Sequence, residues 1–143
     1  MGVRQSRTRR FAIQNEFFDN DVPFKVPINA GNHVIRLVCH HAEGNLEKFH
    51  VKLDYQPYSC APVFSFTVYS NDDCVVTETG LRMENLGFVI GKPFTLDVGV
   101  RRTEVKVDLN GRNLFIENMV HEVKYMIVLG DVVVHSLTSA HEK

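Results

Sequence analysis

The clearest pattern in the chain is an alternation of apolar and polar residues in its second half. Apolar side chains occupy every second position from Phe94 to Val100 and again from Val105 to Leu109. A period of two places them on one face of a β-strand. Asn110-Gly111 then supplies two residues that tolerate positive φ, as a type I′ hairpin turn requires, and Leu114–Ile116 resumes the alternation. This region therefore predicts three consecutive antiparallel strands.

Further strands are predicted on both sides of this unit. Downstream, residues 125–129 and 132–137 are apolar runs joined by Gly130-Asp131, and they predict one final strand with a bend at the glycine. Upstream, short runs separated by Gly, Pro, Asn and Asp predict strands at residues 34–39, 49–55, 64–69 and 75–77. No segment has the periodicity of a helix of useful length. The pattern predicts an all-β protein made of two stacked antiparallel sheets.

Composition and charge indicate one globular domain with a basic N-terminal segment. The 143 residues are 44% hydrophobic and 23% charged, enough to bury a core without disulfides or metals. We expect a basic, partly flexible tail at residues 1–20, a folded domain at 21–138 and a C-terminal tail at 139–143. Four arginines lie in the first ten residues, whereas the net charge is −1, so the rest of the chain carries −5. Nucleic acid is not an expected partner of such a body.

The cysteines and the N-terminus bear on the cellular compartment. Cys39, Cys60 and Cys74 form an odd set without paired spacing, which favours free thiols in a reducing compartment. With no apolar leader and no glycosylation sequon, a cytoplasmic location is expected. Met1-Gly2-Val3-Arg4-Gln5-Ser6 matches the pattern for N-myristoylation at Gly2. An acyl chain plus arginines would bring the tail to a membrane; the alternative is a plain solvated tail.

Four short motifs, in order, resemble the galectin family of β-sandwich lectins. They are Val22-Pro23-Phe24, Gly91-x-Pro93-Phe94-x-Leu96, Val105-x-Val107-x-Leu109-Asn110-Gly111 and Leu129-Gly130-Asp131-Val132. The resemblance covers about residues 22–137. It implies a jelly-roll sandwich of the galectin and concanavalin type, no enzyme activity and β-galactoside binding on one concave sheet. It also implies cytosolic residence that is compatible with unconventional secretion.

The sequence departs from the galectin pattern at the sugar site. The family carries His-x-Asn-x-Arg on one strand, where the outward positions here are Ser65, Thr67 and Tyr69. A third strand of the galectin sugar site carries a Trp followed by Glu and Arg, and this chain has no Trp. The apolar face of galactose packs on that indole, and such stacking contributes roughly 0.5–1.5 kcal/mol beyond the buried area. Altered or weak β-galactoside binding is therefore expected.

The remaining site candidates come from strands near this one. Tyr69 is a candidate stacking platform, although a tyrosine at a strand end also serves as edge packing. His50 and Lys52 are expected to border any groove, and the alternative for both is an ordinary solvated sheet face. Three further charged candidates lie near the position where galectins carry the Trp, Glu and Arg set. The alternative interpretation of these residues is that they are solvated loop charges: Glu78, Arg82 and Glu84.

Other chemistry has no support in the sequence. Although there are seven histidines, His40 and His41 are adjacent and would point to opposite faces of a strand, so no metal site is predicted. No nucleophile elbow or phosphate-binding glycine loop occurs. Glu78 and Glu84 are six residues apart across a glycine, which is poor geometry for a glycosidase carboxylate pair. We expect neither a cofactor nor an enzyme.

Two main functional hypotheses follow. The first is a non-catalytic galectin-like module that binds a glycan or glycoprotein with altered or weak affinity for β-galactosides. The second is a protein-interaction or assembly domain that has lost sugar binding and pairs with a protein partner, or as a homodimer, through an edge strand. A third is a membrane-tethered adaptor that uses Gly2. Fold alone does not decide among them, because function resides in the site.

Overall fold

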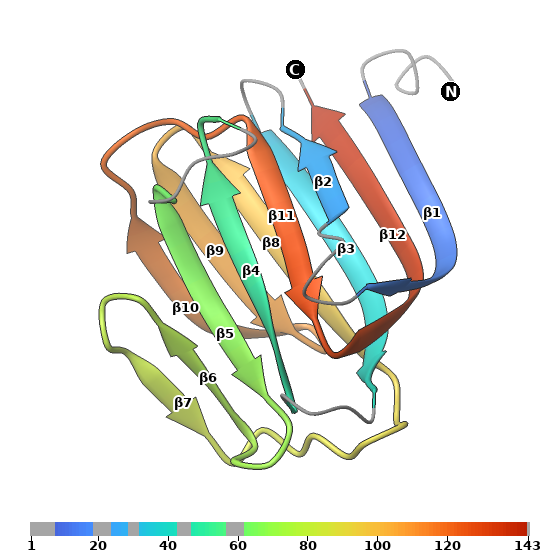
Figure 1. Ribbon diagram of the computed structural model, residues 1–143. Coiled ribbons are helices and arrows are strands. Elements are labelled where there is room, and N and C mark those ends of the chain that lie inside the picture. Colours follow the sequence, from blue (N-terminus) through green and yellow to red (C-terminus); the bar gives the residue numbers. More distant parts are fainter. Residues whose placement is uncertain (1–7, 19–23, 29–31, 43–46, 57–61, 143) are drawn as a thin grey trace.

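The computed structural model consists of two six-stranded sheets packed face to face (Figure 1). It describes residues 8–18, 24–28, 32–42, 47–56 and 62–142. The first sheet has the order β1 (Thr8–Phe18), β12 (Val132–Glu142), β3 (Asn32–His41), β8 (Phe94–Arg101), β9 (Glu104–Leu109) and β10 (Arg112–Asn118). The second sheet has the order β2 (Phe24–Pro27), β11 (Tyr125–Gly130), β4 (Lys48–Asp54), β5 (Phe64–Tyr69), β6 (Cys74–Thr77) and β7 (Arg82–Glu84).

This architecture confirms the predicted all-β sandwich. Neighbouring strands pair antiparallel, as in the β3–β8 and β4–β5 ladders. No helix occurs in the described ranges, so none there could cross a membrane. The alternation predicted from the sequence separates the two faces of each sheet, because successive side chains of a strand point in opposite directions.

The core lies between the sheets and is built from the alternating apolar residues. Phe49 and Phe66, from the second sheet, are among its largest fully buried side chains. Phe115 of β10 crosses the interface from the first sheet, with its ring centroid 5.6 Å from that of Phe66 and 5.9 Å from that of Phe64. Aromatic pairs at this spacing add to the energy of area burial. The two layers are therefore held by side-chain packing, with no disulfide among the described cysteines.

The β9–β10 hairpin has the turn predicted for it. Asn110 and Gly111 have φ angles of 50° and 83°, so both central residues are left-handed, as in a type I′ turn. The Asn110 side chain also accepts a hydrogen bond from the backbone N–H of Thr95, at 2.9 Å. This bond joins the turn to β8 and fixes the hairpin against its neighbour.

The expected single bent strand at residues 125–137 is wrong in one respect. The two runs are separate strands in different sheets, since β11 pairs with β2 and β4 whereas β12 pairs with β1 and β3. Gly130, with φ of 124°, is the point at which the chain passes from one layer to the other. The sequence marked the bend correctly, but a local pattern does not reveal which partner each half will pair with.

The ends of the folded region also differ from expectation. Residues 8–18, expected within the N-terminal tail, form β1, which pairs with β12 from Thr8 opposite Glu142 to Phe18 opposite Val132. Strand β12 runs through residues 139–142, which were expected to be a C-terminal tail. Strand β1 thus gives hydrogen-bond partners to the backbone groups of β12 that do not face β3, and β12 does the same for one edge of β1. Gly2 and Cys60, for which the sequence suggested lipidation and a free thiol, lie outside the described residues.

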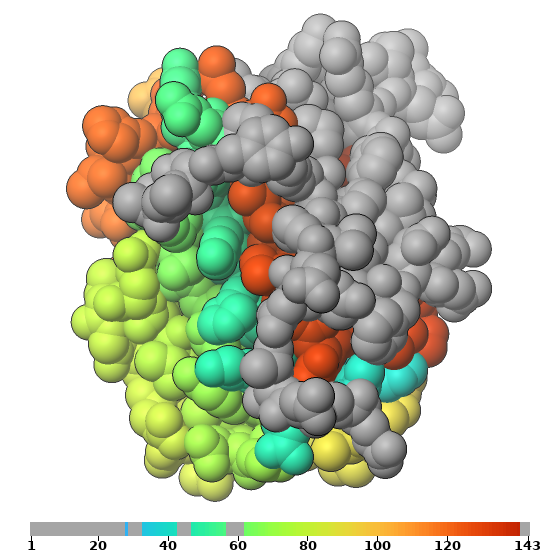
Figure 2. Space-filling model, viewed as in Figure 1, coloured from blue at the N-terminus to red at the C-terminus, as the bar shows by residue number. Residues whose placement is uncertain are grey.

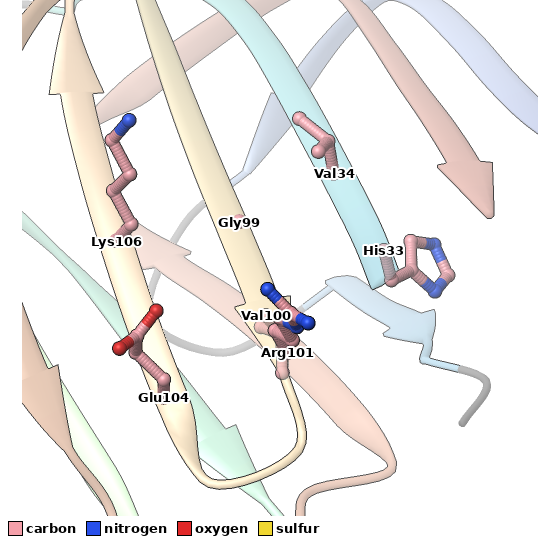
Figure 3. A pocket seen from close by; sticks show the side chains of 7 residues that line it. All are labelled: His33, Val34, Gly99, Val100, Arg101, Glu104 and Lys106. Atoms are coloured by element: carbon pink, nitrogen blue, oxygen red, sulfur yellow. The ribbon is translucent and has the colours of Figure 1, made fainter. Parts of the chain in front are cut away.

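The outer face of the first sheet is hollowed beside Gly99 (Figure 3). The hollow measures about 280 Å³ and lies between the exposed Val34 on β3 and Lys106 on β9. Val34 pairs with Gly99 and Gly99 with Lys106, so the three occupy one row across the sheet. The hollow therefore exists because the central position of that row carries no side chain.

Candidate functional site

The candidate site is the outer face of the second sheet, on strands β4 to β7. In β4, Phe49, Val51 and Leu53 point into the core, and the intervening residues point out. In β5, Phe64, Phe66 and Val68 are buried in the same way. Figure 2 views the molecule from this side, where β4 (teal) and β5 (green) reach the surface. The outward residues of these two strands are Lys48, His50, Lys52, Ser65, Thr67 and Tyr69.

Strand register arranges this outer face, here called the β4–β7 face, in rows that run across the sheet. One row places His50 opposite Thr67, Thr67 opposite Val76, and Val76 opposite Arg82. The neighbouring row consists of Lys48, Tyr69, Cys74 and Glu84. Directly paired residues on one face lie within side-chain contact distance. The register therefore gathers residues that are more than thirty positions apart in the sequence.

A histidine–threonine pair occupies the middle of the first row. His50 Nδ1 lies 2.8 Å from Thr67 Oγ1, which is a hydrogen bond. The pKa of His50 is lowered, chiefly by burial and then by the nearby Lys48 and Lys52 ammonium groups. Each of these effects disfavours the charged imidazolium. His50 is therefore neutral at pH 7, and this pair offers a fixed donor and acceptor to a ligand.

An ion pair lies at the end of the face on β7. Arg82 Nε donates to Glu84 Oε1 at 2.6 Å, and both side chains are exposed. The pKa of Arg82 is raised, first by this hydrogen bond. Because the two residues are separated by one position on a strand, they share a face. The pair presents a guanidinium with donors left over for a ligand, next to an oriented carboxylate.

Glu78 has a structural role in the described fold. Its Oε1 accepts a hydrogen bond of 2.9 Å from the backbone N–H of Ser65, and its own N–H donates to the Ser65 carbonyl at 3.0 Å. Glu78 follows the end of β6, where β5 would otherwise lose its partner. The carboxylate thus continues the ladder for Ser65.

Tyr69 and Cys74 stand side by side in the second row. Tyr69 is half-buried, with the Nζ atom of Lys48 5.8 Å from its ring centroid. This distance is within the range of a cation–π contact. Cys74 is fully buried beneath its neighbours, and burial is the main cause of its raised pKa. The site therefore contains one aromatic ring with a buried, unreactive thiol beside it.

The structure brings most of the candidates predicted from the sequence onto one face. Five are on β4 and β5, two are on β7, and Glu78 is bound to the backbone at the start of β5. Lys48, Val76 and Cys74 belong to the same face but were not singled out. Alternation in β4 could have identified Lys48. For β6, only four residues long, no local signal reveals which face is which.

Comparison with solved structures identifies the fold as that of the galectins. Galectin LEC-6 from Caenorhabditis elegans is 23% identical with a TM-score of 0.69, covering 89% of this chain and 96% of its own. A variant of human galectin-16 is 19% identical with a TM-score of 0.68, and the match covers 86% of this chain and 96% of that protein. Sheep galectin-11 in complex with glycerol is 19% identical with a TM-score of 0.66, and the match covers 82% of this chain and 95% of that protein. No protein-family model and no curated protein sequence matches the chain.

Proposed function

We propose that the protein is a non-catalytic glycan-binding module whose ligand lies on the β4–β7 face. The observation that carries this proposal is the placement of the Arg82–Glu84 pair, the His50–Thr67 pair and the Tyr69 ring in adjacent rows of one exposed face. Sugars are bound by fixed donors and acceptors around their hydroxyls, with an aromatic ring against an apolar sugar face. The galectin fold supports the same reading.

The charge of this face favours glycans that carry an acidic group. Lys48 and Lys52 flank His50, and the two described ion pairs involve neither lysine. The Glu78 carboxylate is bound to a backbone N–H, and that of Glu84 is held by Arg82. Lys48 and Lys52 therefore place two ammonium groups beside His50, whose pKa both of them lower. In our proposal, sulfated or carboxylated glycans bind better than a neutral galactoside, because this protein has no tryptophan on which a galactose ring could stack.

A glycan array with neutral, sulfated and sialylated members, together with a lactose column, tests this proposal. We expect signal on acidic glycans and little retention on lactose. Arg82→Ala should weaken binding about tenfold or more, because a hydrogen bond to a charged group is worth roughly 1.5–3 kcal/mol. Tyr69→Ala should also weaken it, through loss of the ring.

The matched control is Arg101→Ala, which removes an exposed arginine from the first sheet. It should bind like the wild type, although it changes the net charge equally. If no glycan on the array binds, or if both arginine variants lose the same affinity, the β4–β7 face is not a specific glycan site.

The second candidate function is assembly through an edge strand. Strand β10 ends the first sheet, and its Ile116 side chain is 56% exposed. An exposed apolar residue on an edge strand favours pairing with another chain, and a charge there opposes it. If β10 mediates a homodimer, light scattering after size-exclusion chromatography will give twice the chain mass. Ile116→Lys should then give a monomer.

Val89→Lys serves as the control for this test. Val89 is also 56% exposed but lies in the segment between β7 and β8, outside any strand. The Val89→Lys substitution should therefore leave the assembly unchanged. A monomer in the wild type across micromolar concentrations, or equal effects of the two lysines, would count against assembly through β10.

A further inference from the structure

Two histidines that are far apart in the sequence meet on neighbouring strands at the outer face of the first sheet. His40 lies on β3 and His135 on β12, and their Nδ1 and Nε2 atoms, respectively, are 2.7 Å apart. The ring centroids are separated by 4.8 Å, with the planes tilted by 42°. Both side chains are half-buried. Because the adjacent Cys39 points into the core, His40 faces away from the other sheet.

A strand irregularity brings the two rings together. The β12–β3 register shifts between Val134 and Ser136, which places His135 at a β-bulge. A bulge inserts one extra residue into a strand and redirects a side chain. Val134 and Leu137 keep their buried positions on either side. The extra residue is thus accommodated without disturbing the core, and its imidazole is turned toward His40.

We propose that His40 and His135 form a two-histidine site for a divalent transition metal, with Cu²⁺ preferred. Imidazole nitrogen is the usual protein ligand for such ions. With metal–nitrogen bonds of about 2.0 Å, adjacent nitrogens of a square-planar complex lie about 2.8 Å apart and those of a tetrahedral complex about 3.3 Å. In this structure the two nitrogens are 2.7 Å apart because one ring donates its N–H to the other, and this spacing is close to the square-planar value, which Cu²⁺ favours. When the donor ring carries its proton on its other nitrogen instead, a rotation of each ring would direct both lone pairs at one ion.

The bound ion would be exchangeable and would not be needed for folding. Within the described ranges, no group of three or more metal-ligating side chains is present. Closed structural zinc sites use four protein ligands. Here two positions come from described side chains, and water would fill the positions that they leave. This site lies on the sheet opposite the β4–β7 face, so it is independent of the proposed glycan site.

Calorimetric titration of the full chain with Cu²⁺ at pH 7.5, and separately with Zn²⁺, tests the proposal. We expect one Cu²⁺ per chain and weaker binding of Zn²⁺. His40→Gln and His135→Gln should each weaken Cu²⁺ binding by at least tenfold, since loss of even an outer partner of a metal ligand costs roughly 10–100-fold. His121→Gln, which removes an exposed histidine elsewhere, is the matched control and should bind normally.

A second measurement on the wild type does not depend on variants that fold. In nuclear magnetic resonance spectra, substoichiometric Cu²⁺ should broaden the imidazole signals of His40 and His135 first. Unchanged Cu²⁺ affinity in the His40→Gln, His135→Gln double variant would overturn the proposal. So would broadening confined to other histidines, absence of Cu²⁺ binding at 100-fold excess, or tighter binding of Zn²⁺ than of Cu²⁺.

Discussion

Replacing Gly130 with alanine should destabilise the protein by about 4 kcal/mol or more, the range reached by the most disruptive single substitutions. A Cβ atom there would lie 2.6 Å from Phe49 Cα and 2.7 Å from the Lys48 carbonyl oxygen. Both are backbone atoms of β4, which cannot move aside without disturbing the second sheet. The φ of 124° adds strain for any residue with a side chain. Urea denaturation followed by far-ultraviolet circular dichroism measures the loss.

Gly99→Ala provides the matched control for Gly130→Ala. Gly99 lies in a strand with no left-handed φ, and a Cβ there would be 3.7 Å from its nearest atom, the Lys106 carbonyl oxygen. The added methyl would occupy the hollow shown in Figure 3. We expect a change within about 1 kcal/mol, in the stabilising direction. Equal effects at the two glycines would mean that the close approach at Gly130 is not what constrains the chain.

Acid should destabilise the protein through His41 on β3. This side chain is 1% exposed among the rings of Phe49, Phe88 and Phe94, whose centroids lie 5.0–5.5 Å away. Among the described residues, neither ring nitrogen has a hydrogen-bond partner. Burial lowers the pKa of His41 to about 4, with the Asp73 carboxylate acting in the opposite direction. A buried imidazolium would be poorly compensated at this position.

The pH window follows from the two protonation states. Above about pH 6.5, His41 is neutral in both the folded and unfolded chains and contributes no pH dependence. Between pH 6.5 and 4 only the unfolded chain takes up this proton, so stability falls as pH falls; below pH 4 the loss is complete at on the order of 3 kcal/mol. The free energy of unfolding at several pH values in this range measures it.

His41→Phe should remove this contribution while it preserves the aromatic cluster. Its stability relative to wild type should increase by about 3 kcal/mol between pH 7 and pH 4, although other groups also titrate in both proteins. For His121→Gln, at an exposed position, the free energy of unfolding should change with pH as it does for the wild type. A parallel profile for His41→Phe would show that His41 does not resist protonation in the folded chain.

Local patterns predicted the strands that depend on neighbouring residues. The β8 and β9 alternation and the Asn110-Gly111 turn were correct because period, turn type and core-facing residues are all set within a few positions. The division between β11 and β12 was missed because both halves read as apolar strands and only their partners differ. Strand β1 was missed because polar and basic residues dominate its surroundings, and its pairing with β12 joins positions over a hundred residues apart.

The candidate site was predictable only in part for the same reason. Alternation correctly assigned Ser65, Thr67 and Tyr69 to an outer face. It could not show that Glu78 is used by the backbone of Ser65, or that His50 reaches Thr67. Nor did seven histidines in the sequence indicate that His40 would meet His135, since a bulge in β12 is needed to turn the second ring.

The sequence by itself determined the all-β class, the buried face of each regular strand and the sharp hairpin, because these follow from side-chain alternation and the φ preferences of single residues. The tertiary structure alone decided which strands became neighbours, where the chain crosses between layers, and which distant side chains share a surface. Those outcomes depend on register and on packing between sheets, which are set by contacts among residues far apart in the chain.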